Sequence, residues 1–332
     1  MMSPVNSTNP VIRHKEDRDI IWSHGTSFSI VAKKHVNNYG FFNDHNYSPE
    51  DKSPLLAIIG DSYVVAAQVE NKNSMHGILS KETFGKGRVY SFGASGIPLS
   101  TYLAYANYAT KEFQANALVF IINGNDFGAS LIKYNRDPGS HYFSDVSDRL
   151  ELVRKDYQPT LIKRLARQSA LIRYLVLNMQ LNWRPIENIF DNSTRPAEEK
   201  FVGNTRADFN EEYISDSKRV VDRFFEELLL QTGLGNDKIL FVIDGMRPHL
   251  YNLPSLMKAN GSYFDLMRKY FIKFALSKRY EVIDMQPIFI KGHESEKIRF
   301  EFETDNHWNE AGHALVAEKI KATDVYRVLF KK

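Results

Sequence analysis

The hydrophobic positions of this chain form short, uninterrupted apolar runs that alternate with longer segments of helical periodicity. Five runs have the pattern of buried strands, at residues 55–59, 89–92, 117–122, 239–243 and 281–283. Continuous apolar runs of this length are typical of parallel strands that are covered on both faces. Helical patterns lie between them, for example at residues 99–113, and another begins near Glu310. This alternation predicts an α/β fold in which helices cover both faces of a parallel sheet.

The connection between the third and fourth runs is too long to be a single crossover. It contains helical patterns at residues 160–181 and 210–230, separated by a polar stretch at residues 192–204. We therefore expect an inserted helical cap, rooted where the third strand ends. The expected organisation is an N-terminal extension at residues 1–50, a core at 51–127 and 236–332, and a helical insertion at 128–235.

A serine follows the first apolar run. That run ends in Gly60, Asp61 and Ser62, directly before a short helical start. In open α/β sheets, ligands bind at the carboxyl ends of the strands, so this position suits a nucleophile. Aspartate and serine are also preferred residues at helix N-caps, and this motif by itself favours a simple cap.

Three further blocks supply groups that could act with this serine. They are Ser95-Gly96 after the second run, Gly124-Asn125-Asp126 after the third, and His307-Trp308-Asn309 before the last helical pattern. Gly96 can bring a backbone N–H close to a ligand, because it has no side chain. Asn125 offers an amide donor, His307 offers a base, and Asp305 offers a carboxylate two residues before it.

In position and order, these four blocks resemble those of the SGNH (GDSL-type) hydrolase family, which is named after the serine, glycine, asparagine and histidine of its site. The resemblance covers residues 53–127 and 238–325. It implies an α/β, flavodoxin-like parallel sheet of about five strands, with helices on both faces and, in this chain, the inserted helical cap. It also implies a serine-dependent enzyme that needs no cofactor or metal, and it favours an extracytoplasmic location.

The last block departs from the usual Asp-x-x-His pattern of that family. The place three residues before the histidine is Thr304, and the acid is Asp305. The resulting Asp-x-His-Trp pattern is similar to that of SGNH-like O-acetyltransferases that modify exopolysaccharides, which points to a carbohydrate substrate. Residues two apart in an extended loop point the same way, so Asp305 can still reach the imidazole. Glu301 and Glu303 are the less suitable alternatives.

These residue types can carry out acyl transfer. Ser62 is the expected nucleophile, His307 the base that removes its proton, and Asp305 the carboxylate that orients the imidazole. The expected oxyanion donors are the N–H groups of Ser62 and Gly96 and the side-chain amide of Asn125. We expect Asp61 to hold the turn rather than to react.

The predicted function is that of a carbohydrate esterase or O-acyltransferase, most simply one that handles an acetyl group on a glycan, through an acyl-serine intermediate. Its partner would be a glycan or a small acyl ester. The alternative is an inactive glycan-binding or assembly protein on the same scaffold, because a fold alone does not establish chemistry. The displaced acid at Asp305 is the feature that favours this alternative.

Other ionisable residues near strand ends have simpler interpretations. His313 lies six residues after His307 in the predicted helix, a spacing that puts the two on different faces, so we interpret it as a surface or packing residue. His249 is a loop residue or a substrate contact, and Asp284 is a capping acid. Four basic residues of the predicted cap could contact an anionic polysaccharide or a membrane surface, although a solvated helix face is the simpler interpretation: Lys163, Arg164, Arg167 and Arg173.

Composition narrows the class of protein. The 332 residues are 43% hydrophobic, which suffices for one large domain with an insertion. A net charge of +3, from 43 basic and 40 acidic residues, gives no support for nucleic-acid binding. The chain has no cysteine, which excludes disulfides and thiolate chemistry. No apolar run is long enough to span a bilayer, and residues 1–10 lack the pattern of a secretory signal.

Overall fold

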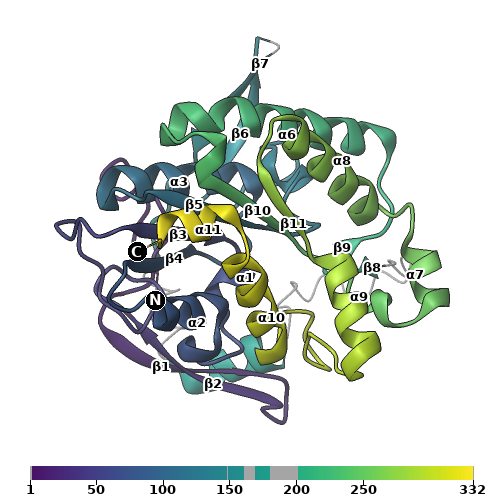
Figure 1. Ribbon diagram of the computed structural model, residues 1–332, viewed down its shortest axis with the longest axis horizontal. Helices are drawn as coiled ribbons and strands as arrows, with labels where there is room; N and C mark the ends of the chain where they lie inside the picture. Colours follow the sequence, from purple (N-terminus) through teal and green to yellow (C-terminus); the bar gives the residue numbers. More distant parts are fainter. Residues whose placement is uncertain (1, 148, 161–168, 180–200, 332) are drawn as a thin grey trace.

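The centre of the molecule is a five-stranded parallel sheet (Figure 1). The computed structural model describes residues 2–147, 149–160, 169–179 and 201–331. The strands of this sheet are β3 (Leu55–Gly60), β4 (Arg88–Gly93), β5 (Ala117–Ile122), β10 (Ile239–Ile243) and β11 (Glu281–Asp284). Their order is β11-β10-β5-β3-β4, and every neighbouring pair is parallel. Numbered within the sheet, this is the flavodoxin-like order 2-1-3-4-5, so the predicted fold class is confirmed.

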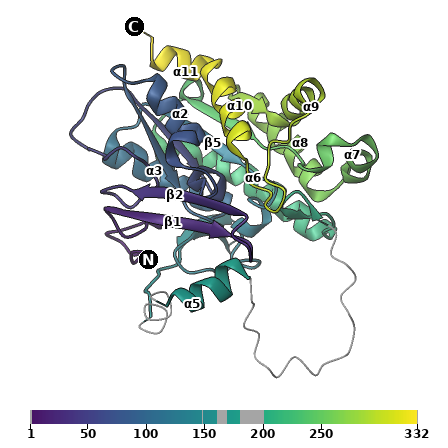
Figure 2. The same cartoon turned by 90° about the horizontal axis from the view of Figure 1, so that it is seen from below.

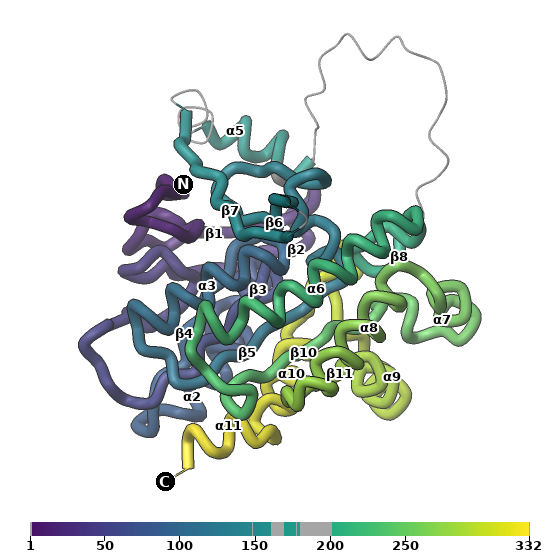
Figure 3. Tube along the Cα trace, turned by 90° about the horizontal axis from the view of Figure 1, so that it is seen from above, coloured from purple at the N-terminus to yellow at the C-terminus, as the bar shows by residue number. Residues whose placement is uncertain are grey.

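Helices cover both faces of this sheet because successive strand residues point to opposite sides. Leu118, Phe120 and Ile122 pack in one core, beneath α3 (Leu99–Phe113), α6 (Glu211–Thr232) and α8 (Tyr263–Ser277) (Figure 3). Val119 and Ile121 pack in the other core, beneath the helices of the opposite face (Figure 1). These are α2 (Met75–Glu82), α9 (Met285–Glu296), α10 (Glu310–Lys321) and α11 (Asp324–Leu329).

The segment between β5 and β10 differs from the expected helical cap. Helix α6, which the sequence placed in the cap, lies on the sheet between α3 and α8 (Figure 3). Its buried residues Val220, Phe224 and Leu228 recur at helical spacing and join the core that lines β5 and β10. An apolar stripe of this width has to be buried against another element, and the sheet provides that surface. Helix α6 therefore belongs to the layer of helices on the sheet, and the division of the whole chain into a core and a cap at residues 128–235 stays a prediction.

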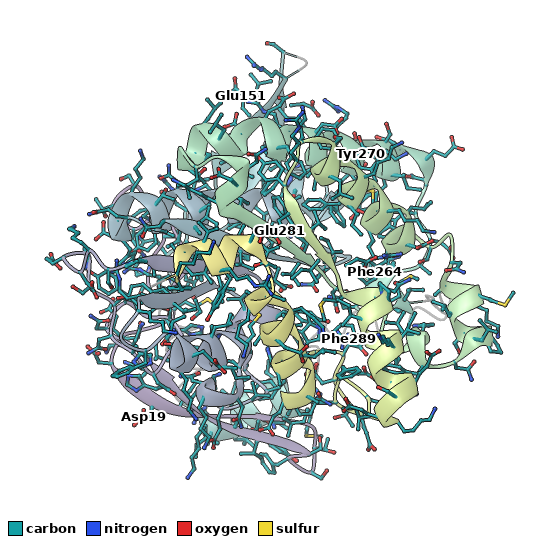
Figure 4. The ribbon with its side chains drawn as sticks, viewed as in Figure 1. Asp19, Glu151, Phe264, Tyr270, Glu281 and Phe289 are labelled. Atoms are coloured by element: carbon teal, nitrogen blue, oxygen red, sulfur yellow. The ribbon has the colours of Figure 1, made fainter. Side chains whose placement is uncertain are left out.

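The same segment also contains strands that the sequence did not indicate. These form two hairpins, β6 (His141–Val146) with β7 (Arg149–Arg154), and β8 (Phe201–Val202) with β9 (Thr205–Arg206). The β6–β7 hairpin projects away from the sheet, with Glu151 on its exposed part (Figure 4). The β8–β9 hairpin is very short, but it lies beside the candidate site described below.

The N-terminal region forms a third hairpin, β1 (Arg18–His24) with β2 (Ile30–Val36). Helix α5 (Ala170–Arg173) and the π-helical turn Tyr174–Asn178 lie against it (Figure 2). These are the described part of the helix expected at residues 160–181. The basic residues Lys163, Arg164 and Arg167 lie outside the described residues, as does most of the polar stretch at 192–204. Arg173 is exposed, which fits a solvated position.

The remaining elements are short. They are α1 (Ser62–Val65), α7 (Leu253–Ala259) and the 3-10 turns Asn71–Asn73, Gly128–Ser130, Asn236–Lys238 and His249–Tyr251. No helix in the described ranges is both long and apolar enough to cross a bilayer.

Candidate active site

The turn between β3 and α1 presents Ser62 at the carboxyl edge of the sheet. Asp61 caps α1, because its carboxylate accepts a hydrogen bond from the backbone N–H of Tyr63 at 3.0 Å. The same carboxylate oxygen accepts a second one from Asn123 Nδ2 at 3.0 Å, which ties this turn to the end of β5. At Gly60, a Cβ atom would lie 2.7 Å from Cγ2 of Val64, so a glycine is needed for α1 to pack this closely. Asp61 holds the turn, as predicted.

The side chains of Ser62, His307 and Asp305 form one hydrogen-bonded chain. Ser62 Oγ lies 2.7 Å from His307 Nε2. On the other side of the ring, His307 Nδ1 makes a short hydrogen bond to Asp305 Oδ1. The backbone N–H of His307 donates to the same oxygen at 2.8 Å. An acid two residues before the histidine therefore reaches the imidazole directly.

Asp305 stays ionised in this arrangement. Burial would raise its pKa, but the hydrogen bond and charge interaction with His307 outweigh burial and lower the pKa of Asp305 below its ordinary value. Its second oxygen, Oδ2, accepts a hydrogen bond from Gln68 Nε2 at 3.0 Å. Gln68 follows α1 and is 7% exposed. Sequence reasoning missed this residue, since a single glutamine in a loop carries no pattern.

A buried arginine holds the histidine loop. The guanidinium of Arg247 pairs with Asp244 at 2.6 Å, and it also donates to the backbone carbonyl of Asn306 at 3.1 Å. The hydroxyl of Tyr63 donates to that same carbonyl at 3.0 Å. Trp308 is fully buried, and its Nε1–H donates to Asp244 at 2.9 Å. The residues on both sides of His307 are thus fixed to the ends of α1 and β10.

Two buried carboxyls lie beneath the nucleophile. Burial raises the pKa of Asp61 to about 6, even though the Tyr63 N–H and the charge of His307 act in the opposite direction. Burial and the nearby charge of Asp61 also raise the pKa of Asp126 well above its ordinary value. Asp126 accepts a hydrogen bond from the backbone N–H of Asn123 at 2.7 Å. The turns after β3 and β5 are joined by the hydrogen bond from Asn123 to Asp61, whereas Asp126 bonds within its own turn.

The expected oxyanion donors come from three neighbouring strand ends. Gly60 and Gly93 are paired in the β3–β4 register, so Gly96 follows a strand that ends beside the Ser62 turn. Gly96 has a φ of +75°, a conformation that favours glycine. Asn125 is exposed at the end of β5, and its Oδ1 accepts a hydrogen bond from Asn204 Nδ2 at 3.1 Å. The roles of Ser62, Gly96 and Asn125 as oxyanion donors stay predictions.

The other ionisable residues named from the sequence have structural contacts. His313 is buried, and its Nδ1 accepts the backbone N–H of Met75 at 3.3 Å, so it is a packing residue. Asp284 caps α9 and pairs with Arg268 at 2.6 Å. Glu301 is buried beside Arg247, and Glu303 is exposed.

His249 lies half-buried in the turn after β10. Within the described ranges, no group of three or more histidine, aspartate and glutamate side chains is arranged to hold a metal ion.

No family model matches the chain, and no curated protein matches it. Among solved structures, it is similar to a lipase/acylhydrolase from Enterococcus faecalis, at 12% identity and a TM-score of 0.39, over 81% of this chain and 96% of that one. It is similar to a member of the lipolytic protein G-D-S-L family from Veillonella parvula, at 12% identity and a TM-score of 0.40, over 82% and 98%. An acetyl xylan esterase matches at 11% identity and a TM-score of 0.41, over 81% and 98%.

Proposed function

We propose that this protein is a serine-dependent ester hydrolase or O-acyltransferase that forms an acyl-serine on Ser62. The observation that carries the proposal is the continuous chain of hydrogen bonds from Ser62 through His307 to Asp305. A serine hydroxyl becomes a competent nucleophile when an adjacent base takes its proton, and a third group that orients the base completes the arrangement.

In the first half of the reaction, Ser62 Oγ attacks the ester carbonyl while its proton moves to His307 Nε2. Asp305 stabilises the imidazolium that forms, because it is already ionised and bonded to Nδ1. The oxyanion of the tetrahedral intermediate takes hydrogen bonds from the donors at the strand ends. When this intermediate collapses, the alcohol leaves with the proton from His307, and the acyl group stays on Ser62.

In the second half, a hydroxyl group attacks the acyl-serine, and His307 takes its proton. Water as the attacking group completes hydrolysis, whereas a sugar hydroxyl completes O-acyl transfer. Collapse of the second intermediate returns the proton to Ser62 Oγ and releases the acid or the new ester. The residues of this chain perform the same steps in both cases.

A groove beside the end of β5 supports a carbohydrate as the substrate. It has a volume of about 750 Å³ and is lined by the aromatic rings of Tyr134, Phe209 and Tyr213 together with polar groups that include Asn135 and Arg206. The rings of Phe209 and Tyr213 are stacked 4.0 Å apart. Aromatic walls with a few polar groups are typical of small-ligand sites, and they suit the apolar faces and hydroxyl edges of a sugar.

This groove begins close to the predicted oxyanion donor. Ala129 lines the groove and follows Asn125 by four residues, a length of chain that spans at most about 14 Å. The near end of a glycan in this groove would therefore lie within about 14 Å of Asn125.

The decisive experiment combines covalent labelling with a product assay. We expect a fluorophosphonate probe to label the wild-type protein and the Ser7→Ala control, in which an exposed serine is removed, but not Ser62→Ala. p-Nitrophenyl acetate is then supplied with and without xylohexaose or chitohexaose, and free acetate is compared with acetylated sugar. Acetylated sugar would identify a transferase, and acetate alone a hydrolase. Equal labelling of Ser62→Ala and the wild type would refute the proposed nucleophile.

The alternative function is that of an inactive glycan-binding protein, and the feature of the sequence that favoured it is the position of Asp305. Although Asp305 lies two rather than three residues before His307, its carboxylate contacts both the imidazole ring and the backbone N–H of His307. Absence of labelling together with binding of an oligosaccharide would be the result that restores it.

A further inference from the structure

The turn of the β8–β9 hairpin bridges the two sides of the candidate active site. Asn204 Nδ2 donates a hydrogen bond to Asn125 Oδ1 at 3.1 Å, on the side of β5. On the other side, Asn306 Nδ2 donates to the backbone carbonyl of Gly203 at 3.2 Å, next to His307. A two-residue turn from a distant part of the chain therefore contacts both the predicted oxyanion donor and the histidine loop.

This turn is held in place by buried neighbours. Val202 and Thr205 pair across the hairpin, and both are buried. A Cβ atom at Gly124 would lie 2.5 Å from the ring of Phe264 and equally close to Oγ1 of Thr205. The glycine thus lets the loop after β5, the hairpin and α8 meet at one point. Further along, the backbone N–H of Tyr263 donates to the carbonyl of Ala207 at 2.8 Å, which fixes the chain beyond β9 to α8.

The hydrogen bonds of the hairpin define which way the Asn125 amide faces. Oδ1 of Asn204 accepts a hydrogen bond from Oγ1 of Thr205 at 3.0 Å, so Nδ2 of Asn204 is the group that faces Asn125. Nδ2 of Asn204 donates its hydrogen bond to Oδ1 of Asn125, and Nδ2 of Asn125 consequently points away from Asn204. An amide in the opposite orientation would present a carbonyl oxygen, which repels an oxyanion.

We propose that Asn204 is a positioning residue that orients Asn125 as an oxyanion donor, an inference that rests on the proposed acyl transfer at Ser62. The hairpin thereby contributes to catalysis without touching the reacting atoms. Because Asn125 acts only when negative charge develops on the substrate oxygen, its orientation affects the transition state far more than substrate binding.

Two substitutions test the orientation directly. Asn204→Ala removes the constraint, and we expect kcat on p-nitrophenyl acetate to fall about two- to tenfold, as for the loss of one neutral hydrogen bond. Asn204→Asp offers only acceptor oxygens, so it pairs with Nδ2 of Asn125 and turns the amide around. We expect kcat to fall about 100-fold, as after loss of an oxyanion donor, with KM within twofold of the wild-type value.

A double-substitution cycle with Asn125→Ala separates orientation from added charge. If Asn204 acts through Asn125, the Asn204→Asp/Asn125→Ala protein is no slower than Asn125→Ala alone. Asn46→Asp is the matched control, since Asn46 is an exposed residue in the loop between β2 and β3. Thermal melting of each variant shows whether a loss of kcat accompanies a loss of the folded state.

Two results would overturn the inference. One is an Asn204→Asp protein that keeps kcat within twofold of the wild type. The other is an Asn204→Asp effect of the same size in the presence and absence of the Asn125 amide. Failure of the underlying function looks different, because wild-type protein that neither reacts with a fluorophosphonate nor turns over the ester would refute the acyl-serine itself.

Discussion

The hydrogen bond from Gln68 to Asp305 provides a sharp test of how this site supports an acid in an unusual position. Gln68→Leu introduces an apolar side chain of similar size and removes the amide that donates to Oδ2 of Asp305. The donor lies 3.0 Å from that oxygen, and Gln68 is 7% exposed. Hydrogen bonds to charged groups contribute about 1.5–3 kcal/mol, which corresponds to about 10- to 150-fold in rate if the loss falls wholly on the transition state.

We expect kcat/KM for p-nitrophenyl acetate to decrease about 10- to 100-fold. The reason is that the Asp305 carboxylate loses the hydrogen bond on Oδ2 that holds its orientation towards His307. The Gln68 hydrogen bond is also one of the contributions that lower the pKa of Asp305, so the substitution raises that pKa. The low pKa of Asp305 in the folded state stabilises the fold at every pH above the pKa that Asp305 has in the unfolded chain, which is about 4. This stabilisation is lost as the pH falls towards the pKa of the folded state. The unfolding free energies of wild type and variant should therefore converge in acid.

Two further variants serve as a test of charge and as a control. Gln68→Glu places a second carboxyl group beside Asp305, and we expect a larger loss of activity at pH 8 than with leucine, since like charges repel. Gln158→Leu changes an exposed glutamine and should be neutral. A Gln68→Leu protein that retains more than half of the wild-type kcat/KM would refute the reasoning, and Asp305 would then be held by His307 alone.

Two further predictions concern buried charge. Arg247→Met leaves the buried carboxylate of Asp244 with Trp308 as its remaining side-chain donor among the described residues. We therefore expect urea denaturation to show a loss of about 3–5 kcal/mol in the free energy of unfolding, much of it recovered in Arg247→Met/Asp244→Asn. A loss below 1 kcal/mol would contradict this. Burial lowers the pKa of His76 to about 3, so stability is lost as the pH falls below 6.5, where only the unfolded state takes up the proton. His76→Leu should therefore reduce the loss of unfolding free energy between pH 7.5 and pH 4.5 by about 3 kcal/mol, and equal losses in both proteins would show that His76 does not titrate in this way.

The framework of the fold was predictable because each strand carries its own signal. A run such as Leu118, Val119 and Phe120 has no polar residue to place in water, so it has to be covered on both faces wherever it lies. The turns that follow these strands then meet at one edge for geometric reasons alone. That is why Ser62 and Asn125 could be assigned to the same edge from the sequence.

The location of α6 could not be read in the same way. Its residues Val220, Phe224 and Leu228 specify a helix with one apolar face, and the sequence predicted that helix. The pattern does not say which surface covers the face. A long connection suggested a cap, whereas the apolar area between α3 and α8 on the sheet is what the helix covers.

The sequence by itself determined the five strands of the central sheet and their order along the chain, the serine turn after β3 and the histidine block before α10, because local periodicity and turn chemistry depend on neighbours in the chain. Only the tertiary structure decided which remote residues contact the site, namely Gln68 at Asp305, Arg247 at the loop of His307 and Asn204 at Asn125. Gln68 and Asp305 are 237 residues apart, and their contact exists only after the sheet has formed. A hydrogen bond needs its partners within about 3 Å, and no pattern along the chain encodes such a distance between remote segments.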